Sequence, residues 1–317
     1  MNSQKKQLNL NNHKKSNKRQ KKHVSGAEYF QINSPQMFTK SLFASKKIIS
    51  MSRQNLNKHL AKKDLSKSNH FIVSEFIAQN MLDIKKHKSI IEAMLQVDKK
   101  YYCKSKDISC YKLSGSTDNQ NDDHDDDNND EHDMNNEKIG KDVLYAHACI
   151  SLVSKLKPGS KVLDVGSNNG MLAVVFANLV NARGDLSKKR GSVISIDIKP
   201  EKVEKCLSNI REDTINRDLL LEDNQDNFKI IEGNGRNGYP ENINKKIYDV
   251  IHVSASNVEH EAPAYLKYQL KEGGLMFMPI NVDGKTTIRI YQRSKGKIKF
   301  VNTKLELDST MNDSELE

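Results

Sequence analysis

The chain has 317 residues, which is enough for one large domain or two small ones. Hydrophobic residues make up only 36% of it, and the net charge is +10. No apolar run approaches the roughly 18 residues of a membrane span, and the first residues lack the apolar stretch of a secretory signal. The four cysteines form no C-x-x-C pair, so neither a zinc site nor a disulfide frame is predicted. We therefore expect no membrane association and a cytoplasmic location.

The charge is unevenly distributed along the chain. Residues 1–22 hold eight Lys or Arg and no acid, whereas residues 118–133 hold nine Asp or Glu and no Lys or Arg. We expect residues 1–70 to be a basic, mostly disordered tail, and residues 114–137 to be a disordered acidic loop inside a domain at 71–310. The tail predicts weak, nonspecific binding to acidic partners or nuclear targeting; a merely solvated tail is the alternative. No metal site is predicted.

Helical spacing of apolar residues predicts amphipathic helices near Phe76–Leu82 and Ile90–Val97, and a further helix over 142–156. Strands and helices then alternate, which predicts an α/β fold with a mostly parallel sheet covered on both faces. The last two strands flank S-K-G and predict an antiparallel hairpin. The expected strands are 161–165, 192–197, 228–232, 248–253, 275–280, 286–291 and 297–302, with helices after the first strand and over 262–271.

The segment L-D-V-G-S-N-N-G at 163–170 joins the first strand to an apolar helix. Gly166 and Gly170 let the backbone turn sharply and come close to a ligand. The spacing is not the dinucleotide pattern G-x-G-x-x-G, because Asn168 stands where its second glycine would be. A nucleotide-like ligand is the favoured interpretation, and a structural strand–helix turn is the alternative.

Asp197 ends the second strand, where a carboxylate can accept both hydroxyls of a ribose. The alternative is an Asp that caps the following helix. The third strand ends in E-G-N-G-R-N-G at 232–238, whose three glycines predict a tight loop near the ligand. Asn234 in this loop is a candidate for a hydrogen bond to an adenine edge.

A glycine turn, an acid after the second strand and a polar turn after the third make up the layout of S-adenosylmethionine-dependent methyltransferases. More specifically, G-N-G-R-N-G-Y at 233–239, Y-D-V-I-H-V-S-A-S at 248–256 and L-K-E-G-G at 270–274 resemble the protein-L-isoaspartate O-methyltransferase family. That family shows G-D-G-R-x-G, D-A-I-H-V-G-A-A and L-K-P-G-G. The resemblance covers roughly 71–112 and 138–302.

This resemblance implies a doubly wound, Rossmann-like methyltransferase sheet in a monomer, with S-adenosyl-L-methionine as cofactor. It implies methyl transfer to the carboxylate of isoaspartyl residues in damaged peptides and proteins. It places the acceptor at Gly140 and Lys141. The implied cofactor-binding residues are Tyr145, Asp164, Gly166, Ser167, Asn169, Gly170, Asp197, Ile198, Asn234 and Gly235.

The acceptor motif differs from the family pattern T-I-S-A-P-H-M-H-A, since residues 138–146 read K-I-G-K-D-V-L-Y-A. Gly140 takes the place of the serine, Asp142 that of the proline and Tyr145 that of the second histidine. Three hypotheses follow. The protein is an active enzyme in which the Gly140 amide or the Lys141 ammonium holds the carboxylate; or it is a noncatalytic S-adenosylmethionine-binding adaptor; or it methylates nucleic acid, which only the basic tail favours.

Overall fold

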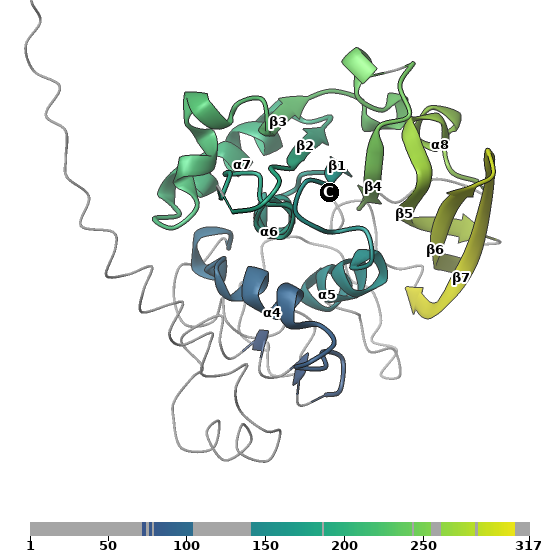
Figure 1. Cartoon of the computed structure of the whole chain (residues 1–317), viewed down its shortest axis with the longest axis horizontal. Helices are drawn as coiled ribbons and strands as arrows, with labels where there is room; N and C mark the ends of the chain where they lie inside the picture. Colours follow the sequence, from purple (N-terminus) through teal and green to yellow (C-terminus); the bar gives the residue numbers. More distant parts are fainter. Residues whose placement is uncertain are drawn as a thin grey trace, which may run out of the picture.

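A seven-stranded sheet lies at the centre of the computed structural model (Figure 1). The structure describes residues 72–73, 76–77, 79–103, 141–185, 187–242, 244–254, 261–282 and 285–307. The strands are β1 (Lys161–Val165), β2 (Ser192–Asp197), β3 (Phe228–Glu232), β4 (Tyr248–Val253), β5 (Leu270–Val282), β6 (Lys285–Ser294) and β7 (Lys297–Leu307).

The strand order is β3-β2-β1-β4-β5-β6-β7. The first five strands in this order are parallel, and β6 and β7 add antiparallel to one edge. The expected mostly parallel sheet with a terminal hairpin is confirmed. Strands β2 and β3 lie on one side of β1, and β4 lies on its other side. The carboxyl ends of β1 and β4 therefore flank the switch point of the strand order, where open α/β sheets bind ligands.

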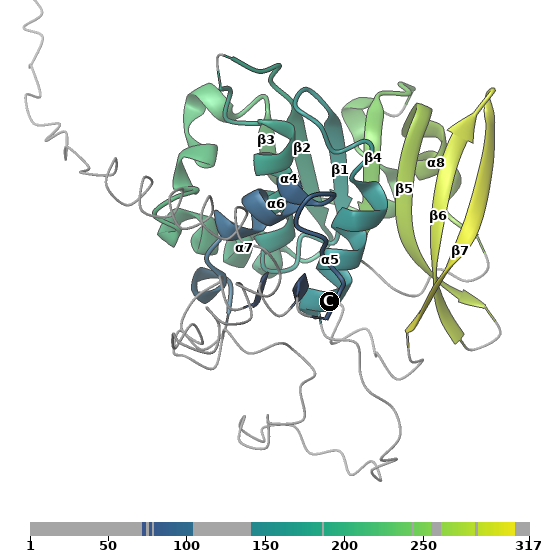
Figure 2. The same ribbon diagram turned by 60° about the horizontal axis from the view of Figure 1, so that its bottom comes forward.

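Helices cover both faces of the sheet (Figure 2). One face packs against α4 to α7 through a core that includes Phe176, Val193 and Phe277. The other face packs against α8 and the loop after β3, through a second core that includes Tyr239, Ile251 and Leu266. The helices are α4 (Lys88–Leu95), α5 (Lys141–Leu152), α6 (Met171–Val180), α7 (Pro200–Glu212) and α8 (Ala264–Gln269), and the 3-10 turns are η1 (Lys99–Tyr101), η3 (Arg217–Leu220), η4 (Glu222–Asn224), η5 (Gly235–Asn237) and η6 (Pro240–Asn242).

Burial explains why β1 and α6 form directly after one another. Four of the five residues of β1 are buried, as expected for a central strand covered on both faces. In α6 only Asn178 escapes burial. A helix that is apolar on all sides is typical of a core position, and α6 lies against β1 and β2. This packing fixes the turn between β1 and α6 on the sheet.

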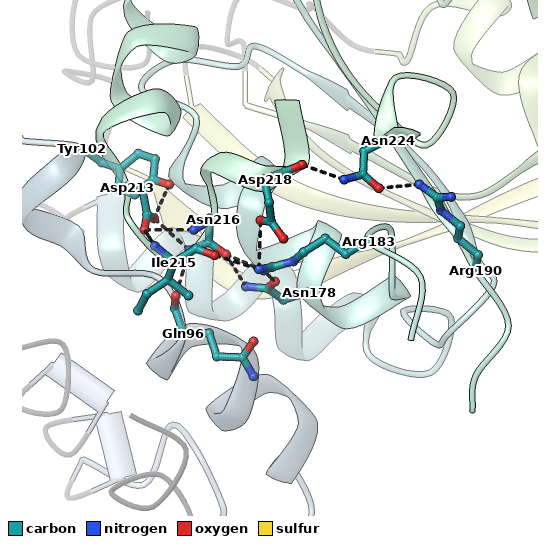
Figure 3. A network of polar contacts seen from close by, with 10 residues as sticks. All are labelled: Gln96, Tyr102, Asn178, Arg183, Arg190, Asp213, Ile215, Asn216, Asp218 and Asn224. Atoms are coloured by element: carbon teal, nitrogen blue, oxygen red, sulfur yellow. Dashed lines mark hydrogen bonds and ion pairs between the residues drawn. The ribbon is translucent and has the colours of Figure 1, made fainter. Parts of the chain in front are cut away.

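A polar network holds the segment between α4 and η1 against the body of the domain (Figure 3). Asn216 donates to the carbonyl of Gln96 at 2.8 Å, and the Tyr102 hydroxyl donates to the Asp213 carboxylate at 2.8 Å. Arg183 donates to the Ile215 carbonyl at 2.9 Å and to Asn216. Burial raises the pKa of Asp213, against the effect of these donors. The N-terminal part of the described chain is therefore attached through buried polar groups as well as apolar contacts.

Several element boundaries differ from the sequence expectation. The helix expected through Leu82 gives way to turn residues from 79 onward, and α5 ends at Leu152 rather than 156. The helix expected over 262–271 is only α8, because Leu270 already begins β5. Strand β5 is longer than 275–280, since it pairs with both β4 and β6. The predicted disordered tail and acidic loop lie outside the described residues.

In the described part of the chain, no helix is long and apolar enough to cross a membrane.

Candidate functional site

The turn between β1 and α6 contains three residues in the left-handed backbone region. Gly166 has φ 90°, Asn168 φ 51° and Gly170 φ 88°. Asparagine is one of the few residues with a side chain that adopts this region readily. This explains how Asn168 can stand where the dinucleotide pattern G-x-G-x-x-G has its second glycine. A Cβ at Gly170 would lie 2.4 Å from the Cys206 sulfur, so only glycine fits there. The turn keeps its shape despite the altered sequence.

The neighbouring strands hold the end of β1. The Gly166 amide donates to the Ile196 carbonyl at 2.8 Å, and the Ser254 amide donates to the Val165 carbonyl at 2.9 Å. The Ser254 hydroxyl also donates to the Gly166 carbonyl at 2.8 Å. Ser254 follows β4, so the turn is attached to β2 on one side and to the end of β4 on the other. Such a turn is preorganised before a ligand arrives.

Asp197 connects the glycine turn with the end of β2. Its Oδ2 accepts from the Asn168 amide at 3.1 Å and from the Ser167 hydroxyl at 3.3 Å. Its Oδ1 accepts from the Lys199 amide at 3.1 Å, directly ahead of α7. The side chain thus bonds the residue ahead of α7 but does not cap that helix, whose N-cap Lys199 has no side-chain capping bond. An ionised carboxylate has about four acceptor positions, so the three bonds leave capacity for a ligand hydroxyl.

Asp164 lies beneath the turn, inside the sheet. It is 1% exposed; its Oδ2 accepts from the Ser195 hydroxyl at 2.6 Å, and its Oδ1 is 2.7 Å from Nδ1 of His252. The three side chains are not a nucleophilic triad, because Ser195 donates to the aspartate and all three are buried. Asp164 supports the strand end from within, and its predicted contact with the cofactor stays a prediction.

Asn169 joins the turn to the N-terminal segment. Its Nδ2 donates to the Tyr102 carbonyl at 2.9 Å, and its Oδ1 accepts from the Met171 amide at 3.1 Å. Asn209 of α7 donates to the backbone carbonyl of Asn169 at 3.0 Å. The predicted cofactor contact of Asn169 is untested, but the structure gives its side chain a different task, which is to hold η1 beside the glycine turn.

Tyr145 of α5 reaches the same turn from another direction. It is buried, and burial together with the nearby Asp164 and Asp142 carboxylates raises the pKa of its hydroxyl well above the usual value. A hydrogen bond from the Asn168 side chain acts in the opposite direction. The phenol therefore remains neutral and uncharged at physiological pH. The phenol lies beside the glycine turn, and its predicted contact with the cofactor stays a prediction.

The loop after β3 completes the site. Asn234 is exposed and its side-chain oxygen accepts from the Arg236 amide at 3.1 Å, which starts η5. Gly235 lies against β1, since a Cβ there would be 2.4 Å from a methyl carbon of Val165. Ile198, next to Asp197, is 62% exposed, so its apolar side chain is accessible to a ligand. An exposed apolar group beside an acid suits a ligand with both a flat apolar part and hydroxyls.

Replacing Gly235 by alanine is expected to push η5 away from β1. The added methyl group would overlap Val165, and the resulting overpacking should cost about 1–3 kcal/mol of stability. Urea unfolding measures this loss. Gly233→Ala is the matched control, because its Cβ would only reach ordinary contact with Ile196 at 3.5 Å. Equal stability of the two variants would contradict the close packing of η5 on β1.

Comparison with known proteins places this arrangement in a family. The family model described as protein-L-isoaspartate(D-aspartate) O-methyltransferase matches residues 67–307. The chain belongs to this family. Its resemblance to the family, expected from the linked motifs, is confirmed.

Individual members of the isoaspartate methyltransferase family match over a shorter range. The protein-L-isoaspartate O-methyltransferase of Caenorhabditis elegans is 36% identical over 157 residues, which cover 49% of this chain and 62% of that protein. Protein-L-isoaspartate O-methyltransferase 2 of Arabidopsis thaliana is 34% identical over 157 residues, 49% of this chain and 46% of that protein. The matched region thus spans about half the length of these relatives.

Solved structures of the family share the fold. A protein-L-isoaspartate O-methyltransferase of Plasmodium falciparum, solved in complex with S-adenosyl-L-homocysteine, has a TM-score of 0.56 at 24% identity. The alignment covers 77% of this chain and 98% of that chain. A second structure, of a protein-L-isoaspartate O-methyltransferase, has a TM-score of 0.53 at 20% identity and covers 77% of this chain and 66% of that one. The Rossmann-like methyltransferase fold is confirmed.

The two predicted acceptor residues lie at the boundary of the described part of this family member. Gly140 is outside the described residues. Lys141 begins α5, but its side chain is not among those described.

Sequence reasoning did not single out Lys99 and His252. Lys99 pairs with Asp142, the residue that stands where the family pattern has proline, and His252 lies in the segment I-H-V. The unusual acid Asp142 in the first turn of α5 was the sequence feature that could have pointed to Lys99.

Proposed function

We propose that the protein transfers a methyl group from S-adenosyl-L-methionine to the carboxylate of L-isoaspartyl residues in damaged proteins, and so acts in protein repair. The observation that carries the proposal is the bond between the Asn168 amide and the Asp197 carboxylate, at 3.1 Å. It joins the glycine turn of β1 and the acid of β2 into one cradle at the switch point of a family member's sheet. The P. falciparum relative, solved with S-adenosyl-L-homocysteine, supports the choice of cofactor.

The residues around the turn fit this cofactor. Asp197 would accept the ribose hydroxyls with its remaining acceptor capacity. The exposed side chain of Ile198 would cover the adenine ring, and Asn234 would offer its carboxamide nitrogen to the edge of the base. The turn itself, with Tyr145 beside it, would surround the methionine part. The predicted cofactor-binding residues of the turn are Gly166, Ser167, Asn169 and Gly170.

The cofactor, when bound, supplies a methyl group on a sulfonium, which is a good leaving group. The acceptor carboxylate is already a nucleophile, so the protein's task is to align the two and exclude water. The acceptor would lie ahead of α5, where helix N-termini favour negative charge. The Gly140 amide or the Lys141 ammonium would hold the carboxylate in place of the family's serine hydroxyl.

The alternative is a noncatalytic adaptor that binds S-adenosylmethionine and recognises proteins. Gly140 and Asp142 favour it, because they replace the serine and proline of the family's acceptor motif. The cofactor cradle does not distinguish the two functions. The two functions differ at the acceptor end of the site, so the experiment that distinguishes them has to change the acceptor residues.

Restoring the serine tests the enzyme hypothesis. Gly140→Ser should raise methyl transfer to an isoaspartyl peptide by about tenfold, which corresponds to roughly 1.4 kcal/mol of transition-state stabilisation. Radiolabelled S-adenosylmethionine measures the transfer.

Deletion of residues 118–133 should also raise activity at low salt, because nine acids would no longer repel the acceptor carboxylate. Cofactor binding without methylation by the parent and both variants would leave the adaptor as the function.

We further propose a monomer in the cytoplasm, whose basic tail binds acidic partners weakly and can direct part of the protein to the nucleus. The eight basic residues in 1–22 support this role. Removing them should leave the melting temperature and the cofactor affinity unchanged. A large loss of either would show that the tail packs on the domain.

A further inference from the structure

A buried ion pair joins η1 to the first turn of α5. The Lys99 ammonium lies 2.6 Å from the Asp142 carboxylate, and the two side chains are 10% and 5% exposed. The partners are 43 residues apart in sequence. Buried ion pairs contribute little net stability because both charges lose their hydration, but the loss of one partner leaves an uncompensated charge. A pair of this kind constrains geometry more than it stabilises the fold.

The pair lies between two segments that both contact the glycine turn. On the side of η1, the Tyr102 carbonyl accepts from Asn169 at 2.9 Å. On the side of α5, Tyr145 follows Asp142 by one helical turn and lies close to the side chain of Asn168. Three contacts therefore connect η1, the glycine turn and α5 to one another. Segment η1 contacts the turn, the turn contacts α5, and the Lys99–Asp142 pair joins α5 to η1.

The other side of η1 is fixed as well. The Tyr102 hydroxyl donates to Asp213 at 2.8 Å, and the carbonyl of Gln96 accepts from Asn216 (Figure 3). Since η1 is attached to the domain body through these bonds, Lys99 extends from a fixed base. Asp142 lies in the first turn of α5, so the pair connects the start of this helix to the fixed η1. The family pattern has a proline at this place, whose ring restricts the first turn of a helix by a different means.

We propose that Lys99 and Asp142 are positioning residues that set the start of α5, and with it the affinity for the methyl acceptor. This inference rests on the proposed function, because it takes the residues directly ahead of α5 as the acceptor site. It assigns to an ion pair of this chain the restraint that a proline supplies in the family pattern. Neither residue touches the reacting atoms, and both act through the first turn of α5, which begins at Lys141.

The experiment compares four proteins: the parent, Asp142→Asn, Lys99→Arg and Glu204→Gln. Asp142→Asn should raise the KM for an isoaspartyl peptide by about tenfold or more, as expected when a hydrogen bond to the charged acceptor is lost. The Kd for S-adenosylmethionine should stay unchanged. Lys99→Arg keeps the charge and should keep the parent KM. Glu204→Gln breaks the exposed Arg211–Glu204 pair of α7 and should change nothing.

Hydrogen exchange supplies a readout that does not need activity. In Asp142→Asn, the amides of 96–103 and of 141–146 should exchange faster together, whereas Glu204→Gln should leave both unchanged. If Asp142→Asn does not fold, the uncharged double variant Lys99→Met/Asp142→Leu takes its place in both measurements, because uncharged side chains of similar volume remove the buried charge.

The outcomes separate this inference from the proposed function. A parent that binds the cofactor but methylates nothing contradicts the function alone, and the exchange data then decide whether the pair fixes α5. Unchanged exchange in both segments overturns the proposal. So does a cofactor Kd that rises by the same factor as the peptide KM, since that is what a merely structural pair would produce.

Discussion

Replacing Asp197 by alanine is expected to weaken the binding of S-adenosylmethionine by roughly 1.5–3 kcal/mol. Two effects add: the ribose loses its charge-assisted acceptor, and the Asn168 amide and Ser167 hydroxyl lose the carboxylate that holds the turn. The corresponding increase in Kd is about tenfold to somewhat more than a hundredfold. Isothermal titration calorimetry measures it directly.

Asp185→Ala is the control for this variant. Asp185 is exposed, lies after α6, and bonds only local groups such as Ser187, so its removal changes the net charge without changing the site. Its Kd should equal that of the parent. An unchanged Kd in Asp197→Ala would remove this residue from the cofactor site and leave it as the support of α7 alone.

Replacing Asp164 by alanine is expected to be the most destabilising change, at about 3–5 kcal/mol of unfolding free energy. The carboxylate is the acceptor of both Ser195 and His252, and all three are buried in the centre of the sheet. His252 is also enclosed by the rings of Phe176 and Phe277, which offer no acceptor. Without the carboxylate, two buried donors lose their partner.

Urea unfolding of Asp164→Ala and of Asp226→Ala tests this expectation. Asp226 is an exposed residue ahead of β3, and its loss should change stability by no more than about 0.5 kcal/mol. If the two variants unfold at the same urea concentration, the Asp164 cluster is not the internal support of β1 that the structure indicates.

The central strands were predictable from the sequence because each is a short apolar run that only a buried strand explains. The bounds of β1, β2, β3 and β4 agree with the expectation. Strand β5 was not predictable in full, because Gly273 and Gly274 suggest a loop. The strand begins ahead of them because Leu270 pairs with Tyr248 of β4, and after a register shift it pairs with both β4 and β6 from Leu275 onward. Tertiary pairing, rather than local propensity, sets its length.

The candidate site was predictable at the level of the backbone. The glycine turn, Asp197 and the loop with Asn234 meet at one edge of the sheet, as the strand order requires. The directions of side chains were not predictable in the same way. Asn169 turns toward Tyr102, and Asp164 turns toward Ser195, because groups from distant parts of the chain offer bonds there. The Lys99–Asp142 contact likewise depends on the folded packing of η1 against α5.

Methyl transfer to a pair of peptides that differ only in one linkage tests the central claim most directly. One peptide carries an L-isoaspartyl residue, and its twin carries the normal aspartyl residue at the same place. With radiolabelled S-adenosylmethionine, the protein is expected to label the isoaspartyl peptide and not the twin, and Asp197→Ala should lose this labelling at low cofactor concentration. Equal labelling of both peptides, or labelling of neither by a protein that binds the cofactor, would contradict an isoaspartyl methyltransferase.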